Sequence, residues 1–375
     1  MGRSTRWYSI ATGTEEYPAL TGIRACGAIA VFFDHFPLWE GAHPVINVLA
    51  FFYVLSGFLI IRLYYDKLRF TPRWMSGYFI RRFARIYPVY FLLLTIAFYL
   101  SPIFRPILLD PEHHRLILLK NYTLTQSLFR WQPEVVLQPS WSLTVEECFY
   151  LFAPIFILLI RRFKFFVSLL SGVLLLLIAL YISTFGMQFL QTPTFIFSTT
   201  FFGHFFEFFC GIGLALVIMR LEKKDIPKKK GYQWTIVGGI GIIVLLFYMM
   251  YVYSHPPLDI NTVIVTSNFL MPVPIALLYF GLIREKTFVA RGLSGKIAGL
   301  LGRSSYSFYL LHILVIEYFS LPRLPTLFGG HRLLAVLLTL IFTWVLSIGL
   351  FKLYEEPINL WIRRVFIPKN KPATA

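Results

Sequence analysis

Ten long apolar stretches recur along this 375-residue chain, and they restrict its fold more than any other feature. Each stretch approaches the roughly 20 residues that an α-helix needs to cross the hydrocarbon core of a bilayer. Hydrophobic residues make up 57% of the chain and charged residues only 14%, which leaves too little polar surface for a water-soluble domain. The sequence therefore predicts an all-α, polytopic membrane helical bundle that forms one domain over residues 1–375. The expected spans are about 19–38, 45–64, 86–102, 147–160, 165–186, 200–219, 235–253, 263–283, 304–321 and 333–353.

Lysine and arginine residues collect in alternate connections between these spans. If the N-terminus lies in the cytoplasm, the inner segments hold 28 of the 35 basic residues, the outer segments hold 6, and Arg24 lies within the first span. Such an asymmetry is the positive-inside signature, and it predicts that both termini are cytoplasmic. Topology and anionic inner-leaflet lipid also account for the net charge of +17, so we expect no nucleic-acid partner. No signal-peptide cleavage site follows the first apolar stretch, which is therefore expected to remain as a span.

Small residues in the spans are interpreted as packing positions. The three cysteines, Cys26, Cys148 and Cys210, fall in or beside predicted spans. Their spacing contains no pair typical of a disulfide or a metal site, so neither is expected. The segment FFYVLSGFLI contains Ser56 and Gly57, which favour a close approach of two helices.

The first predicted span contains two ionisable residues, Arg24 and His35, within the stretch LTGIRACGAIAVFFDHFP at 20–37. An α-helix turns about 100° per residue, so a separation of eleven positions brings both side chains to within roughly 20° of one face, about 16 Å apart along the axis. A charge inside a membrane helix is costly unless it faces a cavity or a partner. The pair therefore indicates a functional interior, while a packing arginine beside a hydrogen-bonded histidine is the alternative.

Ionisable residues of three other spans are expected at a depth similar to that of His35, in the outer half of the membrane. They come from the start of the fourth span, the sixth span and the end of the ninth, and they are Glu146, Glu147, His204, Glu207 and Glu317. A histidine beside a carboxylate can accept the proton of an alcohol, because the carboxylate orients the imidazole and stabilises its cation. This convergence predicts acyl transfer to a hydroxyl group.

A basic run, RRFARIYP at 81–88, is expected at the cytoplasmic start of the third span. Its guanidinium groups, on Arg81, Arg82 and Arg85, suit bidentate recognition of phosphate. Juxtamembrane arginines are also an ordinary topology signal, so both interpretations remain open from the residues alone. Together with the outer histidine, the run suggests an anionic donor held on the inner side and chemistry performed farther out.

The chain resembles the integral-membrane acyltransferases of family 3. The matching segments occur in the family's order across almost the whole chain: LTGIRACGAIAVFFDH, FFYVLSGFLI, RRFARIYP, WSLTVEECFY, HFFEFFCGIGLA, GRSSYSFYLLH and the terminal YEEP. The resemblance implies transfer of an acyl group, usually acetyl from acetyl-CoA, to a hydroxyl of a cell-envelope carbohydrate or glycolipid. Acetyl-CoA or another acyl-CoA would be a co-substrate, with no permanently bound cofactor and no metal.

The resemblance also implies roles for particular residues. His35 matches the family's catalytic histidine and Arg24 the arginine paired with it. Arg82 and Arg85 match the Arg-x-x-Arg element, and Glu146 matches the glutamate that follows Trp-Ser-Leu. Some members carry an appended extracytoplasmic esterase-like domain, for which this chain has no room, so we expect transfer to the acceptor within the membrane domain.

Further residues are expected to support the site or to contact the acceptor. Glu207 matches an acidic family position that often follows an arginine by three residues, where this chain has His204. Trp141 and Tyr309 are candidates for stacking on a sugar ring. The whole supporting set is Asp34, Trp141, Ser142, Glu147, Glu207, Tyr309, His312 and Glu317.

Two other classes of function are compatible with these residues. A transporter or exporter of a glycan or small molecule would use His35, Glu207 and Glu317 as a proton relay, although the two halves of the chain lack the paired broken helices typical of inverted repeats. A non-catalytic envelope scaffold would leave Arg24 and His35 unexplained. The residues do not select the acceptor, the acyl chain length or the oligomeric state, nor do they decide whether His35 acts as a general base or as a covalent acyl carrier. The expected location is a bacterial cytoplasmic membrane.

Overall fold

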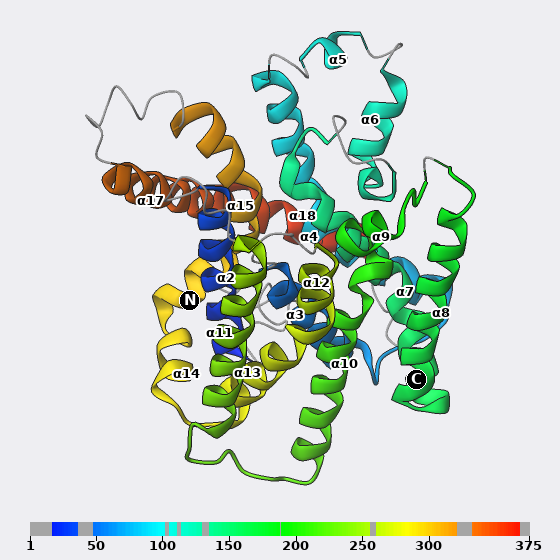
Figure 1. The fold of residues 1–375 in the computed structure, drawn as a ribbon, viewed down its shortest axis with the longest axis vertical. Coiled ribbons are helices and arrows are strands. Elements are labelled where there is room, and N and C mark those ends of the chain that lie inside the picture. The colour runs from blue at the N-terminus through cyan, green and yellow to red at the C-terminus, as the bar shows by residue number, and fades with distance from the viewer. Residues whose placement is uncertain are drawn as a thin grey trace, which may run out of the picture.

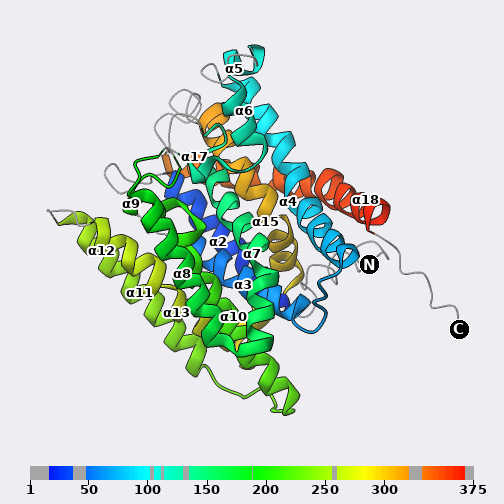
Figure 2. The same cartoon turned by 90° about the vertical axis from the view of Figure 1, so that its right-hand side faces the viewer.

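The computed structural model describes residues 17–36, 48–101, 105–110, 114–129, 135–187, 189–255, 260–320 and 332–367. Within these ranges the chain is helical, and strand-like pairing is limited to two isolated bridges, Phe129 with Phe189 and Lys229 with Glu285. The predicted all-α class is therefore confirmed. Figures 1 and 2 show the helices gathered into one bundle, with α5 (Arg105–Leu109) and α6 (Arg115–Tyr122) projecting at one end.

The other α-helices make up the body of the bundle. In chain order they are α2 (Pro18–His35), α3 (Leu49–Tyr64), α4 (Pro72–Leu100), α7 (Trp141–Phe163), α8 (Phe165–Ser183), α9 (Pro193–Thr199), α10 (Phe201–Lys223), α11 (Gln233–Ser254), α12 (Ile260–Val265), α13 (Pro272–Arg284), α14 (Phe288–Leu293), α15 (Lys296–Val315), α17 (Arg332–Leu350) and α18 (Glu356–Phe366). Three π-helical turns extend helices, namely η3 (Thr266–Leu270), η4 (Ile316–Ser320) and η5 (Phe351–Glu355). Two 3₁₀ turns are η1 (Gln126–Leu128) and η2 (Gln138–Ser140), of which η2 leads directly into α7.

Seven helices of the described ranges are long and apolar enough to cross a membrane. They are Pro72–Leu100, Gln138–Phe163, Phe165–Ser183, Phe201–Lys223, Gln233–Val252, Asn261–Arg284 and Leu333–Phe366, and Leu49–Tyr64 is apolar but shorter. The two remaining expected spans also form helices, but α2 carries Arg24, Asp34 and His35, and α15 carries Lys296 and Arg303, which lower their mean hydropathy. The chain is thus a multi-pass helical bundle, while the count of ten spans and the cytoplasmic termini stay predictions.

Helices α4 and α7 begin well before the expected spans, and this changes where their polar residues lie. Pro72 occupies the first turn of α4, where its missing N–H breaks no helical hydrogen bond, and Thr71 Oγ1 accepts a hydrogen bond from Trp74 N at 3.3 Å. The basic run at 81–85 therefore lies within α4 and not before it. Likewise, α7 begins at Trp141, so the acidic pair that follows is already inside the helix.

Glycines bring the central helices into close contact. A Cβ on Gly57 of α3 would lie 2.1 Å from Phe208 O of α10, and a Cβ on Gly211 of α10 would lie 1.9 Å from Val54 O of α3. A Cβ on Gly302 of α15 would lie 1.8 Å from a backbone oxygen of α2. Such close approach is typical of small residues between membrane helices, and it confirms the predicted role of Gly57. In both views α2 and α3 lie at the centre, with later helices around them (Figures 1 and 2).

Candidate active site

Two neighbouring cavities in the centre of the bundle contain most of the predicted site residues. The first, which we call the arginine cavity, has a volume of about 110 Å³, and its polar lining includes Arg24, Ser56, Arg82, Arg85, Glu146 and Arg363. The second, which we call the histidine cavity, has a volume of about 360 Å³, and its lining includes Asp34, His35, Trp141, His204 and Asn268. Leu49 and Tyr309 line both cavities, so they mark the boundary between them. Arg24 and His35, from one face of α2, thus line the first and the second cavity respectively.

The hydrogen bond of His35 determines which ring nitrogen is available for chemistry. Nδ1 of His35 lies 3.0 Å from Val31 O, one helical turn earlier. A carbonyl oxygen only accepts hydrogen bonds, so Nδ1 carries the proton and Nε2 of the neutral ring carries the lone pair. His35 is half-buried and lines the histidine cavity. Its Nε2 is therefore in the protonation state that a general base requires.

A second imidazole, that of His312, lies beside His35. The two ring centroids are 5.0 Å apart and the rings meet edge to face. His312 is fully buried in α15, and its Nδ1 donates a hydrogen bond to Tyr309 O at 2.6 Å. Among the described residues its Nε2 has no hydrogen-bond partner. The contact arises because α2 and α15 pack closely, which the spacing of residues along the chain does not reveal.

Tyr309 and Ser142 form a hydrogen-bonded wall between the two cavities. Ser142 Oγ lies 2.7 Å from the hydroxyl of Tyr309, and both groups are within 3.0 Å of Pro139 O. Tyr53 adds a hydrogen bond to Ser142 O at 3.4 Å. Pro139 belongs to η2, immediately before α7, so the start of this helix is tied to α15 at the boundary of the cavities.

His204 and Glu207 form a buried pair beside the histidine cavity. His204 Nδ1 lies 3.0 Å from Glu207 Oε2, and His204 Nε2 donates to Ser198 O at 3.2 Å. The histidine at this position therefore keeps a hydrogen-bonded contact to the carboxylate, in place of the arginine expected from the resemblance. The ring of His204 lies 6.0 Å from that of Trp141, which also lines the cavity. Both nitrogens of His204 are therefore engaged, whereas only Nδ1 of His35 is engaged by Val31 O.

Glu146 lies with the arginines and not with His35, contrary to the expected grouping. Its Oε1 accepts hydrogen bonds from Ser56 Oγ at 2.6 Å and from the hydroxyl of Tyr150. α7 starts at Trp141, so Glu146 lies about 7.5 Å further along the helix axis, at the level of the arginine cavity. Ser56 and Tyr150 were not predicted as site residues, although both stand in segments that carried the family resemblance.

Arg82 and Arg85 are held in the arginine cavity by different partners. Arg82 Nη2 donates to the hydroxyl of Tyr64 at 3.1 Å, and its guanidinium lies over the Tyr150 ring at 5.0 Å. Arg85 forms an ion pair with Glu355 Oε1 and lies over the ring of Tyr306 at 5.4 Å. Both side chains are therefore preorganised by groups that the protein itself supplies.

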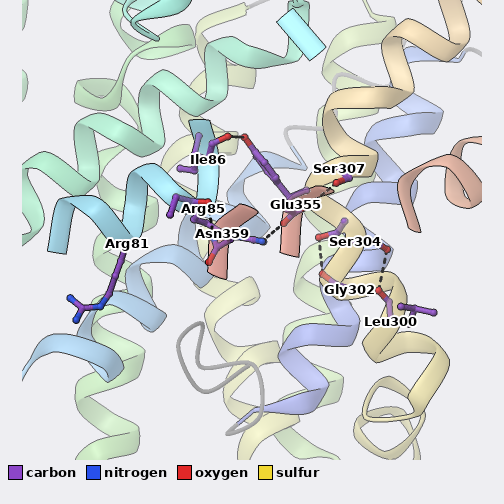
Figure 3. A network of polar contacts seen from close by, with 12 residues as sticks. Arg81, Arg85, Ile86, Leu300, Gly302, Ser304, Ser307, Glu355 and Asn359 are labelled. Atoms are coloured by element: carbon purple, nitrogen blue, oxygen red, sulfur yellow. Dashed lines mark hydrogen bonds and ion pairs between the residues drawn. The ribbon is translucent and has the colours of Figure 1, made fainter. Parts of the chain in front are cut away.

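Glu355 is a further site residue that sequence reasoning did not identify. Its second oxygen accepts a hydrogen bond from Ser307 Oγ at 2.6 Å, so one carboxylate joins α4 and α15 (Figure 3). Asn359, one turn later, donates to Ala84 O at 2.7 Å. The signal was present in the terminal YEEP segment, where an acidic side chain follows a long apolar helix.

Arg81 does not line the arginine cavity. Figure 3 shows its side chain directed away from the network around Glu355. It lines a separate cavity at the start of α4 together with Lys67, Arg69, Arg73 and Trp74. Arg81 points about 100° away from Arg82 around the helix axis, and it lies one turn, about 6 Å, before Arg85, so it reaches a different cavity from either.

Four other members of the predicted set line neither central cavity: Glu207 and His312, described above, and Glu147 and Glu317. Glu147 is half-buried, and its Oε1 has no hydrogen-bond partner among the described residues. Glu317 is exposed in η4. Within the described ranges, no three His, Cys, Asp or Glu side chains lie close enough to hold a metal ion. The arrangement thus places a histidine in one cavity and guanidinium groups held by protein partners in the other.

Comparison with known proteins gives this geometry a family context. A family model described as an acyltransferase domain, that of acyltransferase family 3, matches residues 17–352. The peptidoglycan O-acetyltransferase OatA of Listeria monocytogenes serovar 1/2a is 25% identical over 99% of this chain and 61% of its own length. The O-acetyltransferase OatA of Staphylococcus aureus strain NCTC 8325 is 25% identical over 94% of this chain and 59% of its own length.

The chain spans about three fifths of the length of these curated relatives. No solved structure matches it. The family model nevertheless covers nearly the whole chain, including every residue that lines the histidine cavity and all those that line the arginine cavity except Arg363. The chain therefore belongs to acyltransferase family 3.

Proposed function

We propose that this protein transfers an acetyl group from acetyl-CoA to a hydroxyl of a cell-wall carbohydrate, with His35 as the general base. The observation that carries the proposal is the hydrogen bond from His35 Nδ1 to Val31 O, because it leaves the Nε2 lone pair available in the histidine cavity. The names of the relatives, which are peptidoglycan and other O-acetyltransferases, support this choice of acceptor and acyl group. The protein would act in a bacterial cytoplasmic membrane with both termini inside.

The proposed reaction uses the same nitrogen twice. Nε2 of His35 takes the proton of the acceptor hydroxyl as the oxygen attacks the thioester carbonyl carbon. When the tetrahedral intermediate collapses, the carbon–sulfur bond breaks and the thiolate of CoA takes that proton from Nε2. Val31 O keeps its hydrogen bond to Nδ1–H throughout and stabilises the transient imidazolium.

The two cavities would hold different parts of the substrates. The arginine cavity, at about 110 Å³, suits a slender chain such as the pantetheine arm better than a nucleotide. The histidine cavity is larger, and Trp141 and Tyr309 give it aromatic surfaces on which a sugar ring can stack. The thioester would then lie near Tyr309, where the two cavities adjoin.

The test is acetyl transfer by purified protein in nanodiscs, with labelled acetyl-CoA and peptidoglycan fragments. We expect His35→Gln to lower turnover by roughly 10²-fold or more, the usual scale for a positioned general base. His255→Gln is a matched control, because His255 also donates Nδ1 to the carbonyl four residues earlier, Tyr251 O at 2.9 Å, but is exposed outside both cavities. Near-normal turnover in His35→Gln, with a stable fold, would exclude His35 as the base.

A further inference from the structure

The third cavity, which we call the Trp74 cavity, lies at the start of α4 and has a volume of about 450 Å³. Its ionisable lining consists of Asp66, Lys67, Arg69, Arg73 and Arg81. Four cations against one carboxylate give a formal charge of +3. A concave surface of this charge attracts a ligand with several negative charges.

The Trp74 cavity adjoins the arginine cavity through the same two helices. On α4, Arg81 of the Trp74 cavity lies one turn before Arg85 of the arginine cavity. On α18, Arg363 lines the arginine cavity, and Ile367, just after the helix, lines the Trp74 cavity. Arg363 Nη2 also lies 3.4 Å from Arg81 O. Both cavities therefore lie along α4 and beside the end of α18, about one helical turn apart on α4.

An aromatic surface accompanies the cations. The Trp74 ring is stacked on that of Tyr78, with centroids 5.6 Å apart and planes at 9°. The edge contact with Tyr64, at 5.8 Å and 84°, fixes the stack from a second direction. Base stacking on an aromatic ring is tolerant of base identity, and guanidinium groups bind phosphate through paired hydrogen bonds. Phosphate recognition and base recognition are thus available within one cavity.

We propose that the Trp74 cavity binds the 3′-phosphorylated ADP end of CoA, while the pantetheine arm runs along α4 into the arginine cavity. This proposal rests on the proposed function, and it adds a nucleotide subsite in which Lys67, Arg69, Arg73 and Arg81 face the phosphates. The arginine cavity is too small for the nucleotide, which requires a second compartment. The headgroup of an anionic phospholipid offers phosphate but neither an adenine base nor a 3′-phosphate.

The experiment compares acetyl-CoA with acetyl-dephospho-CoA, which lacks the 3′-phosphate, in nanodiscs of neutral lipid. The variant is Lys67→Gln/Arg69→Gln, and the control is Lys224→Gln, an exposed lysine outside the three cavities. We expect the double variant to raise the KM for acetyl-CoA about tenfold or more, because charge-assisted hydrogen bonds to phosphate are lost. Its kcat should change little, and its preference for acetyl-CoA over acetyl-dephospho-CoA should fall toward one.

A direct measurement of nucleotide binding tests the nucleotide subsite independently of the proposed acetyl transfer. Wild-type protein should bind adenosine 3′,5′-diphosphate, and the double variant should bind it at least tenfold more weakly, whether or not any thioester is turned over. Absence of transfer with every thioester would reject the proposed function alone. Unchanged binding and KM in the double variant would overturn the nucleotide subsite. So would a variant that loses only a stimulation by phosphatidylglycerol, because the cavity would then belong to a lipid headgroup.

Discussion

Removal of the Glu355 carboxylate should destabilise the protein strongly, because it would remove the buried ion-pair partner of Arg85. The Glu355 side chain is 1% exposed and the Arg85 side chain is 14% exposed, so water can replace very little of the lost ion pair. Breaking a buried ion pair by removing one partner typically costs about 3–5 kcal/mol. Glu355→Ala also removes the acceptor for Ser307 Oγ and leaves an empty volume, so its effect should lie at the upper end of this range.

A conservative series distinguishes charge from volume. Glu355→Gln keeps the shape and one acceptor oxygen, so it should cost less than Glu355→Ala. Replacing both partners, as Arg85→Gln/Glu355→Gln, removes both charges of the pair, so much of the stability should return. The free energy of unfolding in mixed micelles measures this, and the double-mutant cycle should give a coupling of at least about 1 kcal/mol.

In this series of variants, recovery of the free energy of unfolding should not restore the KM for acetyl-CoA. The double variant lacks the Arg85 guanidinium, so its KM for acetyl-CoA should stay raised even where its stability recovers. Glu355→Gln keeps Arg85 and should affect the donor KM less. Wild-type stability in Glu355→Ala, or a cycle with no coupling, would refute the account of Glu355 as the partner that holds Arg85 in place.

Two further predictions concern packing and pH. Gly57→Ala should greatly lower the yield of folded protein, because the new Cβ would lie 2.1 Å from Phe208 O. Gly239→Ala, whose new Cβ would have no atom within 4 Å, should be neutral or more stable by up to about 1 kcal/mol. Size-exclusion profiles and thermal unfolding compare the two variants, and a well-folded Gly57→Ala would contradict the close contact. Burial opposes the charge of Glu285, but hydrogen bonds from the first turn of α11 outweigh burial and lower the pKa of this carboxyl below its ordinary 4.5. The stability that Glu285 contributes is therefore complete above the unfolded-state pKa and is lost as pH falls through the folded-state pKa. The melting-temperature difference between wild type and Glu285→Gln should then shrink below about pH 4.5. A difference that grows below this pH would contradict a lowered pKa of Glu285.

Several features of the site were predictable because they depend on local geometry. The eleven-residue separation of Arg24 and His35 places them on one face of any α-helix, and in the structure they line the two adjoining cavities. Gly57 was predictable as a contact position because small residues suit close helix packing. The first residues of α4 and α7 were harder to predict, since Thr71, Pro72 and the turn before Trp141 extend these helices beyond their apolar cores.

The sequence by itself determined that the chain is a helical membrane protein, because apolar length and low charge leave no other way to satisfy the backbone in lipid. It also identified the residues whose burial needs an explanation, among them His35, Glu146 and Arg85. Only the tertiary structure decided their partners: His312 beside His35, Ser56 and Tyr150 on Glu146, and Glu355 on Arg85. Helical periodicity fixes the direction of a side chain relative to its own axis, but the neighbour it meets depends on how distant helices pack.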